Sequence, residues 1–241
     1  MSVDGLSSPR ASRELEAFAG AVLHELRTPL ATLSGEVDVA LRRQRSAGEY
    51  RDALKRIADR VGELAEITGD LAFLADRGAA MPPQRASLSG ILVYLADRYA
   101  AVRGANVTIL TIPASMEIAG DERLIVRALT LLLEHGVRHR LDGAALRLGI
   151  APLQGEPSQS EWVTLMLDAA PPAFVPATWD CLGDAEGDWL LRPPGLLRLQ
   201  AAAAMLRACG ASAAVEPRDG VPAVRIRLRR ADAGAGTERD G

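Results

Sequence analysis

Residues 18–30 read Phe-Ala-Gly-Ala-Val-Leu-His-Glu-Leu-Arg-Thr-Pro-Leu, which places a histidine, an acid and a threonine in one amphipathic stretch. In a helix, His24 and Thr28 are one turn apart and share a face, whereas Glu25 lies about 100° round the axis. An imidazole that attacks a phosphoryl group through one ring nitrogen must release the proton of the other, and a neighbouring carboxylate can accept it. Glu25 is the natural base for such a step. Pro29 removes one backbone donor and is expected to bend the helix just past the histidine.

Apolar residues recur at helical spacing on both sides of this stretch and predict one long helix. They are Leu15, Phe18, Ala19, Val22, Leu23, Leu26, Leu30, Leu33, Val37 and Leu41. After a short turn at Ser46-Ala-Gly48, a second stripe from Tyr50 to Leu74 predicts another helix, which is expected to end around Gly78. Two helices joined by so short a turn pack antiparallel, yet a lone pair cannot bury such broad stripes. We therefore expect the hairpin to dimerise into a four-helix bundle.

Beyond Met81-Pro-Pro83 the pattern changes to alternating helices and strands. Expected helices cover residues 89–103, 121–140 and 195–209, and expected strands cover residues 106–112, 145–151, 162–167, 213–216 and 223–228, with a turn at 217–220. The predicted fold class is α plus α/β. The expected organisation is a helical hairpin at 12–78, a linker at 79–86, an α/β domain at 87–229 and a disordered tail at 230–241.

The unbroken run from His24 to Leu30 resembles the phospho-acceptor box of sensor histidine kinases. The resemblance implies that His24 carries the phosphoryl group, that Glu25 is the base, and that Thr28 helps to orient water when the partner is dephosphorylated. It also implies a homodimeric hairpin and a response regulator receiver domain as the partner. Arg27 and Leu30 are then candidates for the surface on which that partner docks.

The α/β segment is similar to the ATP-binding sandwich of the same family, but its ligand residues depart from the family pattern. The resemblance places the two asparagines of the helical nucleotide-binding box at Leu131 and His135, and the second would supply an amide oxygen to Mg²⁺. Mg²⁺ prefers oxygen ligands, so imidazole is a poor replacement and leucine offers none. Glu134 is the neighbouring oxygen donor. These substitutions make binding of a magnesium nucleotide doubtful, and no separate metal site is expected.

The adenine and phosphate boxes also depart from the family pattern. Asp168 ends the expected strand where the resemblance implies a reader of the adenine amino group, although a strand-end carboxylate that starts a turn explains it equally well. The following residues, Ala169-Ala-Pro-Pro172, include no glycine, and the two prolines restrict the turn. Gly195 is left from the final glycine pattern. The stretch before it is acidic, which disfavours ATP.

Composition narrows the class of protein further. A chain of 241 residues, 48% of them hydrophobic, favours two globular domains, and a net charge of −3 with dispersed basic residues argues against a nucleic-acid partner. No apolar run reaches the roughly 18 residues that span a bilayer, and Met1 to Arg10 has no signal-peptide pattern. We expect a cytoplasmic protein without membrane attachment. Cys181 and Cys209 have no partner motif and are expected to be reduced thiols.

Three functions are consistent with these features. The favoured hypothesis is a phosphorelay protein in which His24 exchanges a phosphoryl group with the aspartate of a receiver domain, while the ATP-type domain has lost nucleotide binding and needs no cofactor. The second is an ATP-dependent sensor kinase, in which Glu134 or His135 helps to hold Mg-ATP and Asp168 reads the adenine. The third is a non-catalytic docking module. The intact box at His24, beside the altered positions at Leu131, His135 and 169–172, favours the first.

Overall fold

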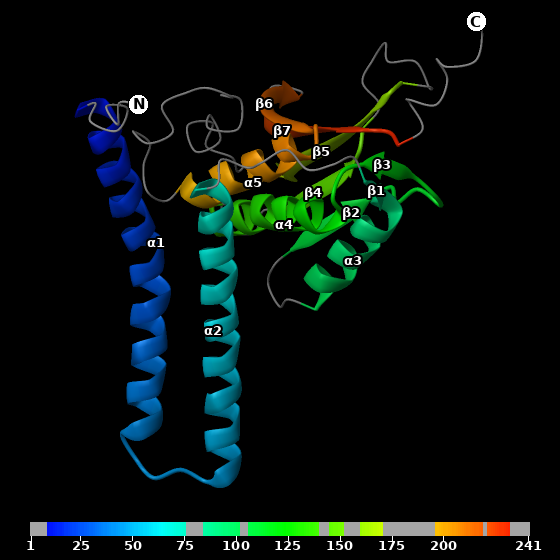
Figure 1. Ribbon diagram of the computed structural model, residues 1–241. Helices are drawn as coiled ribbons and strands as arrows, with labels where there is room; N and C mark the ends of the chain where they lie inside the picture. The colour runs from blue at the N-terminus through cyan, green and yellow to red at the C-terminus, as the bar shows by residue number, and fades with distance from the viewer. Residues whose placement is uncertain are drawn as a thin grey trace, which may run out of the picture. The chain divides into compact units, whose positions relative to one another are not determined.

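The computed structural model describes residues 9–75, 84–101, 106–139, 145–151, 160–170, 196–218 and 221–231. The chain divides into a helical hairpin and an α/β domain, and each is described here by itself (Figure 1). The predicted α plus α/β fold class is confirmed by this architecture.

The hairpin consists of α1 (Pro9–Leu41) and α2 (Ala47–Ala75), which run side by side in opposite directions (Figure 1). Across the pair, Nε of Arg60 donates to Oε1 of Glu36 at 3.4 Å, which holds the two helices in register. Several large apolar side chains are left at the surface of the hairpin: Leu23, Leu30, Val39, Leu41, Tyr50, Leu54 and Val61. The hairpin by itself therefore leaves part of its apolar stripes in water.

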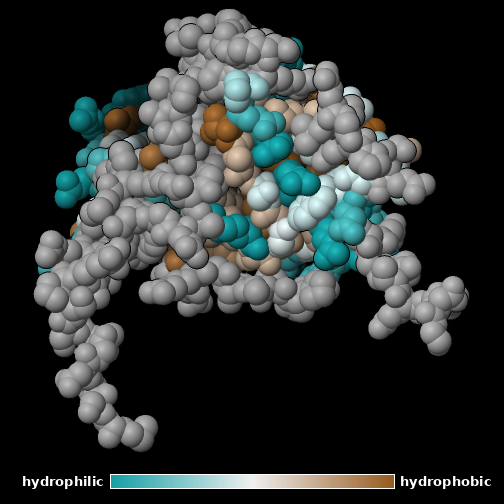
Figure 2. Space-filling view, turned by 90° about the horizontal axis from the view of Figure 1, so that it is seen from above, coloured by the Kyte–Doolittle hydropathy of each residue, from teal (hydrophilic) through white to brown (hydrophobic). Residues whose placement is uncertain are grey.

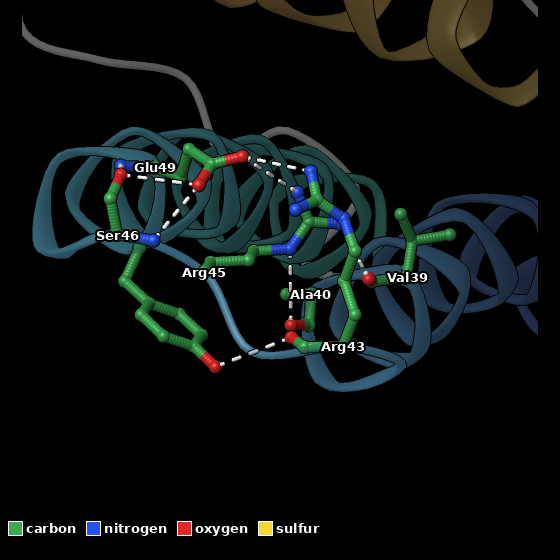
Figure 3. Close-up of polar contacts among 7 residues, drawn as sticks. Val39, Ala40, Arg43, Arg45, Ser46 and Glu49 are labelled. Carbon is green, nitrogen blue, oxygen red and sulfur yellow. Dashed lines mark hydrogen bonds and ion pairs between the residues drawn. The ribbon is translucent and has the colours of Figure 1, made fainter.

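A capping box closes the turn between the two helices. Ser46 Oγ accepts the N–H of Glu49 at 3.2 Å, and Glu49 Oε2 accepts the N–H of Ser46 at 2.8 Å (Figure 3). Arg45 donates to the carbonyl oxygens of Val39 at 2.8 Å and Ala40 at 3.2 Å, and its guanidinium lies 3.8 Å from the Glu49 carboxylate. These bonds satisfy free backbone groups at the end of α1 and at the start of α2.

The α/β domain contains a five-stranded sheet of order β2-β4-β5-β7-β6 and a two-stranded sheet of β1 and β3. Only the β2–β4 pair in the larger sheet is parallel. The elements are β1 (Arg85–Ser87), α3 (Leu88–Ala100), β2 (Val107–Leu110), β3 (Glu117–Ala119), α4 (Glu122–His139), β4 (Ala145–Ile150), β5 (Trp162–Ala170), α5 (Leu197–Ala208), β6 (Ser212–Arg218) and β7 (Val221–Arg229).

Some element bounds differ from those expected. The β1–β3 pair was not predicted, and it takes Arg85 and Ala86 out of the expected linker because they pair with Ala119 and Ile118. Strand β6 extends to Arg218, into the expected turn at 217–220, and β7 begins at Val221, just after that turn and before the expected start at 223. The disordered tail is predicted to begin at residue 230, yet the backbone N–H of Arg230 donates to the carbonyl oxygen of Glu161 at 2.7 Å. Residues 232–241 lie outside the described part of the chain.

The two faces of the larger sheet differ in chemistry. Helices α3, α4 and α5 form one layer against the sheet (Figure 1), and the strands direct leucines to the buried side, as in the cross-strand pair Leu148 and Leu167. The alternate positions pair Arg147 with Asp168 and Met166 with Arg225. Seen from above, the surface that the grey atoms leave open mixes hydrophilic with small hydrophobic patches (Figure 2).

Within the described ranges, every helix is too short or too polar to cross a lipid bilayer.

Candidate functional site

His24 lies on α1 with its side chain exposed, Glu25 beside it is half-buried, and Thr28 is exposed one turn later. The helix is continuous from Pro9 to Leu41, so the sequence spacing translates directly into positions on its surface. Pro29 lies inside this helix and does not end it. An exposed imidazole with an adjacent carboxylate is suited to accept a phosphoryl group from a bulky donor and to pass it to a partner protein.

The surface around the histidine is partly apolar. Leu23 is 64% exposed and Leu30 is 48% exposed, and Arg27 between them is exposed as well. These residues form an open surface with apolar and cationic character next to His24. Arg27 and Leu30, the docking candidates predicted from the sequence, are both exposed on the hairpin.

One contact near the histidine was missed from the sequence. The hydroxyl Oγ1 of Thr32 donates to the carbonyl oxygen of Thr28 at 3.1 Å. A threonine in the interior of a predicted helix is the signal that could have indicated it, because threonine hydroxyls often bond to the carbonyl one turn back.

The candidates of the C-terminal domain lie in two different places. Leu131 and His135 are on α4 and are only 1% and 4% exposed, so they belong to the helical layer. The carboxylate of Glu134 is 3.6 Å from the guanidinium of Arg98 on α3, which makes it part of an ion pair between helices. Sequence analysis did not identify Arg98, since a contact between helices 36 residues apart in sequence has no local signal.

Asp168 lies on the opposite face of the sheet from these helices. Its Oδ1 accepts a hydrogen bond from Nε of Arg147 at 2.7 Å, and the two residues are cross-strand partners in β4 and β5. Its neighbours Leu165 and Leu167 on β5 point to the other, helix-covered face. The structure therefore does not bring Asp168 together with Glu134 and His135. Gly195 lies outside the described residues.

Comparisons with known proteins place a phospho-acceptor domain over the hairpin. Residues 14–80 match the family model of the His Kinase A (phospho-acceptor) domain. The sensor protein IrlS of Burkholderia pseudomallei is 30% identical over 141 residues, which are 57% of this chain and 30% of IrlS. The sensor histidine kinase CusS of Escherichia coli O157:H7 is 28% identical over 135 residues, 54% of this chain and 28% of CusS. The chain thus spans about a third of the length of these curated relatives.

Solved structures share the architecture of both units. The histidine kinase AdeS of Acinetobacter baumannii has a TM-score of 0.58 at 16% identity, covering 86% of this chain and 97% of that chain. The chain thus carries a His Kinase A (phospho-acceptor) domain at residues 14–80 and is similar to sensor histidine kinases beyond it. Full-length ShkA matches this chain with a TM-score of 0.52 at 18% identity, over 90% of this chain and 46% of ShkA. At these identities the structural likeness concerns the fold.

The resemblance of the α/β domain to ATP-binding domains implies a nucleotide held with Mg²⁺, but Leu131 and His135 do not supply the oxygen ligands that this metal prefers. A buried leucine offers no ligand at position 131, and the buried imidazole of His135 is a poor ligand for a hard cation. The nearest oxygen donor in sequence, Glu134, pairs with Arg98. No group of three or more His, Cys, Asp or Glu side chains in the described ranges could hold a metal ion.

Proposed function

We propose that the chain is the catalytic core of a two-component sensor histidine kinase, in which His24 takes a phosphoryl group from ATP and yields it to an aspartate of a response regulator receiver domain. The observation that carries the proposal is the exposed His24 in a phospho-acceptor hairpin, with Glu25 beside it and Thr28 one turn on. The relative CusS is named a sensor histidine kinase, and its similarity to this chain supports ATP as the donor.

The residues of the hairpin account for the chemistry at histidine. A nitrogen of His24 forms a bond to the γ-phosphorus of ATP while the bond from that phosphorus to the β,γ-bridging oxygen breaks and ADP leaves. Glu25 accepts the proton that the other ring nitrogen releases, which keeps the imidazole from accumulating positive charge. In the second step a receiver carboxylate attacks the same phosphorus and the nitrogen–phosphorus bond breaks. Thr28 would help to orient water when the receiver is later dephosphorylated. No step is assigned to Mg²⁺.

A second copy of the chain is the expected partner of the hairpin. Leu41 and Leu54 are 72% and 63% exposed, on α1 and α2 respectively, so both helices carry apolar surface that their own pairing does not cover. Burying such side chains stabilises association by about 25 cal/mol per Å² of apolar area. A homodimeric four-helix bundle would provide that burial.

A specific observation supports a second candidate function, phosphotransfer without ATP. Leu131 is buried where the family has an asparagine, and Asp168 pairs with Arg147 on the face of the sheet away from α4. In this alternative, His24 takes the phosphoryl group from the phosphoaspartate of one receiver and passes it to another. The hairpin chemistry is the same and only the donor differs.

The test is acid-labile labelling of the purified chain. Wild type and His24→Ala are incubated with Mg²⁺ and radiolabelled ATP, and label is measured after denaturation at neutral and at acid pH. Acid-labile label in the wild type alone supports the ATP-dependent kinase. No label from ATP, together with label from a receiver domain charged with labelled acetyl phosphate, supports the second candidate. Absence of label by both routes contradicts both and leaves a docking module.

A further inference from the structure

The turn that follows His24 contains two features that disturb regular helical hydrogen bonding. Pro29 has no N–H with which to donate to the carbonyl of Glu25, the bond that another residue would make there. One turn on, the hydroxyl of Thr32 donates to the carbonyl oxygen of Thr28 at 3.1 Å. Side-chain bonds of this kind compete with the backbone bond to the same carbonyl and bend helices. Both features act on the turn that carries the reactive residues.

Packing does not explain the Thr32 hydroxyl bond, because the Thr32 side chain is exposed. The same bond occurs on α2, where Thr68 donates to the carbonyl of Leu64 at 2.8 Å. Helix α2 contains no proline, so the bond at Thr68 is not accompanied by a missing backbone donor. Only on α1 does it coincide with a missing backbone donor.

We propose that Thr32 is a positioning residue for His24 and Thr28. Its hydroxyl bond sets the local backbone geometry of α1 at the Thr28–Pro29 peptide, and this geometry sets the direction in which the imidazole and the Thr28 hydroxyl leave the helix. Small errors in the direction of a reacting group are costly, since transfer requires alignment of nucleophile, phosphorus and leaving group. This inference rests on the proposed role of His24.

The experiment compares Thr32→Val, which keeps the shape and loses the hydroxyl, with Thr32→Ser, which keeps the hydroxyl. Thr68→Val removes the same type of bond from α2 and is the matched control. Hydrogen exchange is measured by mass spectrometry for the stretch 20–34, and the initial rate of His24 labelling is measured as a function of ATP concentration. The stability of each variant is followed by thermal unfolding.

We expect Thr32→Val to slow exchange in this stretch about threefold, because the backbone bond no longer competes with the hydroxyl. We expect its maximal labelling rate to fall about threefold or more, at an unchanged ATP concentration for half-maximal rate. Thr32→Ser and Thr68→Val should match the wild type in both measurements.

Two results would overturn the positioning role. One is a Thr32→Val variant that labels at the wild-type rate, whether or not its exchange changes; the other is an equal loss in Thr68→Val, which would point to a general effect on the hairpin. A wild type that takes no label from ATP contradicts the proposed donor instead. In that case hydrogen exchange tests the effect of Thr32 on the helix. Slower exchange in Thr32→Val alone supports the positioning role, and any other result contradicts it.

Discussion

Ser46 and Glu49 bind each other across the first turn of α2: the N–H of Ser46 donates to Oε2 of Glu49 at 2.8 Å, and the N–H of Glu49 donates to Oγ of Ser46 at 3.2 Å. Arg43, just past the end of α1, also donates to this carboxylate, at 2.8 Å (Figure 3). The Glu49 carboxylate thus caps α2 and also binds Arg43, just past the end of α1. The geometry of the hairpin turn depends on this small polar cluster, because few apolar groups are buried there.

Loss of the cap should destabilise the hairpin. Ser46→Ala removes the acceptor for the Glu49 N–H and is expected to lower the free energy of unfolding by about 1 kcal/mol. Chemical denaturation followed by circular dichroism measures the change. Ser34→Ala, at an exposed position in the middle of α1, is the control and should leave stability within about 0.5 kcal/mol of wild type. Equal effects of the two variants would contradict a capping role for Ser46.

The contribution of Glu49 should depend on pH. The hydrogen bond from the Ser46 backbone N–H, followed by those from the Ser46 hydroxyl and Arg43, lowers the pKa of Glu49 below its usual value of 4.5. A carboxyl whose pKa is lower in the folded state stabilises that state above the unfolded pKa, and the contribution is lost as pH falls through the folded pKa. The melting temperature of wild type should therefore exceed that of Glu49→Gln at neutral pH and converge with it below pH 4.5. A difference that stays constant across this range would refute the assignment.

The proposed role of Glu25 as the base for His24 phosphorylation can be tested by charge removal alone. Glu25→Gln keeps the size of the side chain but cannot accept the imidazole proton, so we expect the rate of His24 phosphorylation to fall about 100-fold. The rate of acid-labile labelling measures this. Glu16→Gln neutralises another carboxylate of α1 and should label at the wild-type rate. A Glu25→Gln variant that labels normally would require another proton acceptor.

Thr28 should separate the two activities of the hairpin. Thr28→Val removes the hydroxyl proposed to orient water, so dephosphorylation of the receiver should slow about 10-fold or more while phosphorylation of His24 persists. Decay of the labelled receiver in the presence of each variant is the measurement. Loss of both activities in parallel would instead indicate that Thr28 is needed for the shape of the site.

Gly149 allows close approach of the edge strand β2. A Cβ at this position would lie 2.8 Å from Cβ of Leu110 and 3.0 Å from its carbonyl oxygen. Gly149→Ala should therefore destabilise the domain by about 1–3 kcal/mol, as seen for overpacked interiors. Gly62→Ala on α2 meets nothing within 4 Å and should stabilise by about 0.5–1 kcal/mol, because alanine favours helix. Denaturation midpoints of the two variants should move in opposite directions.

The two long helices could be predicted from the sequence because their signals are local and repeat many times. In α1, each turn adds another residue to the same apolar stripe, and the prediction survives an error at any one position. The β1–β3 pair has no such redundancy: each strand is three residues long and is formed only by its pairing with the other, from Arg85 with Ala119 to Ser87 with Glu117. A strand that short has no periodicity to detect.

The residue types of the candidate nucleotide site could be predicted from the sequence, whereas the positions of these residues relative to one another could not. The absence of asparagine at Leu131 and His135 could be read directly, and their burial on α4 agrees with a packing role. The face occupied by Asp168 depends on strand register, where a shift of one residue moves a side chain to the other side of the sheet. That register pairs Asp168 with Arg147 instead of directing it toward α4.

The sequence by itself determined the arrangement of His24, Glu25 and Thr28, the residues proposed to react, because one continuous helix converts spacing along the chain into positions on one surface. The tertiary structure alone decided which distant groups meet: Arg98 with Glu134, and Arg147 with Asp168. Such pairs depend on helix packing and strand register, which are selected by burial of the whole apolar core and carry no local signal in either partner.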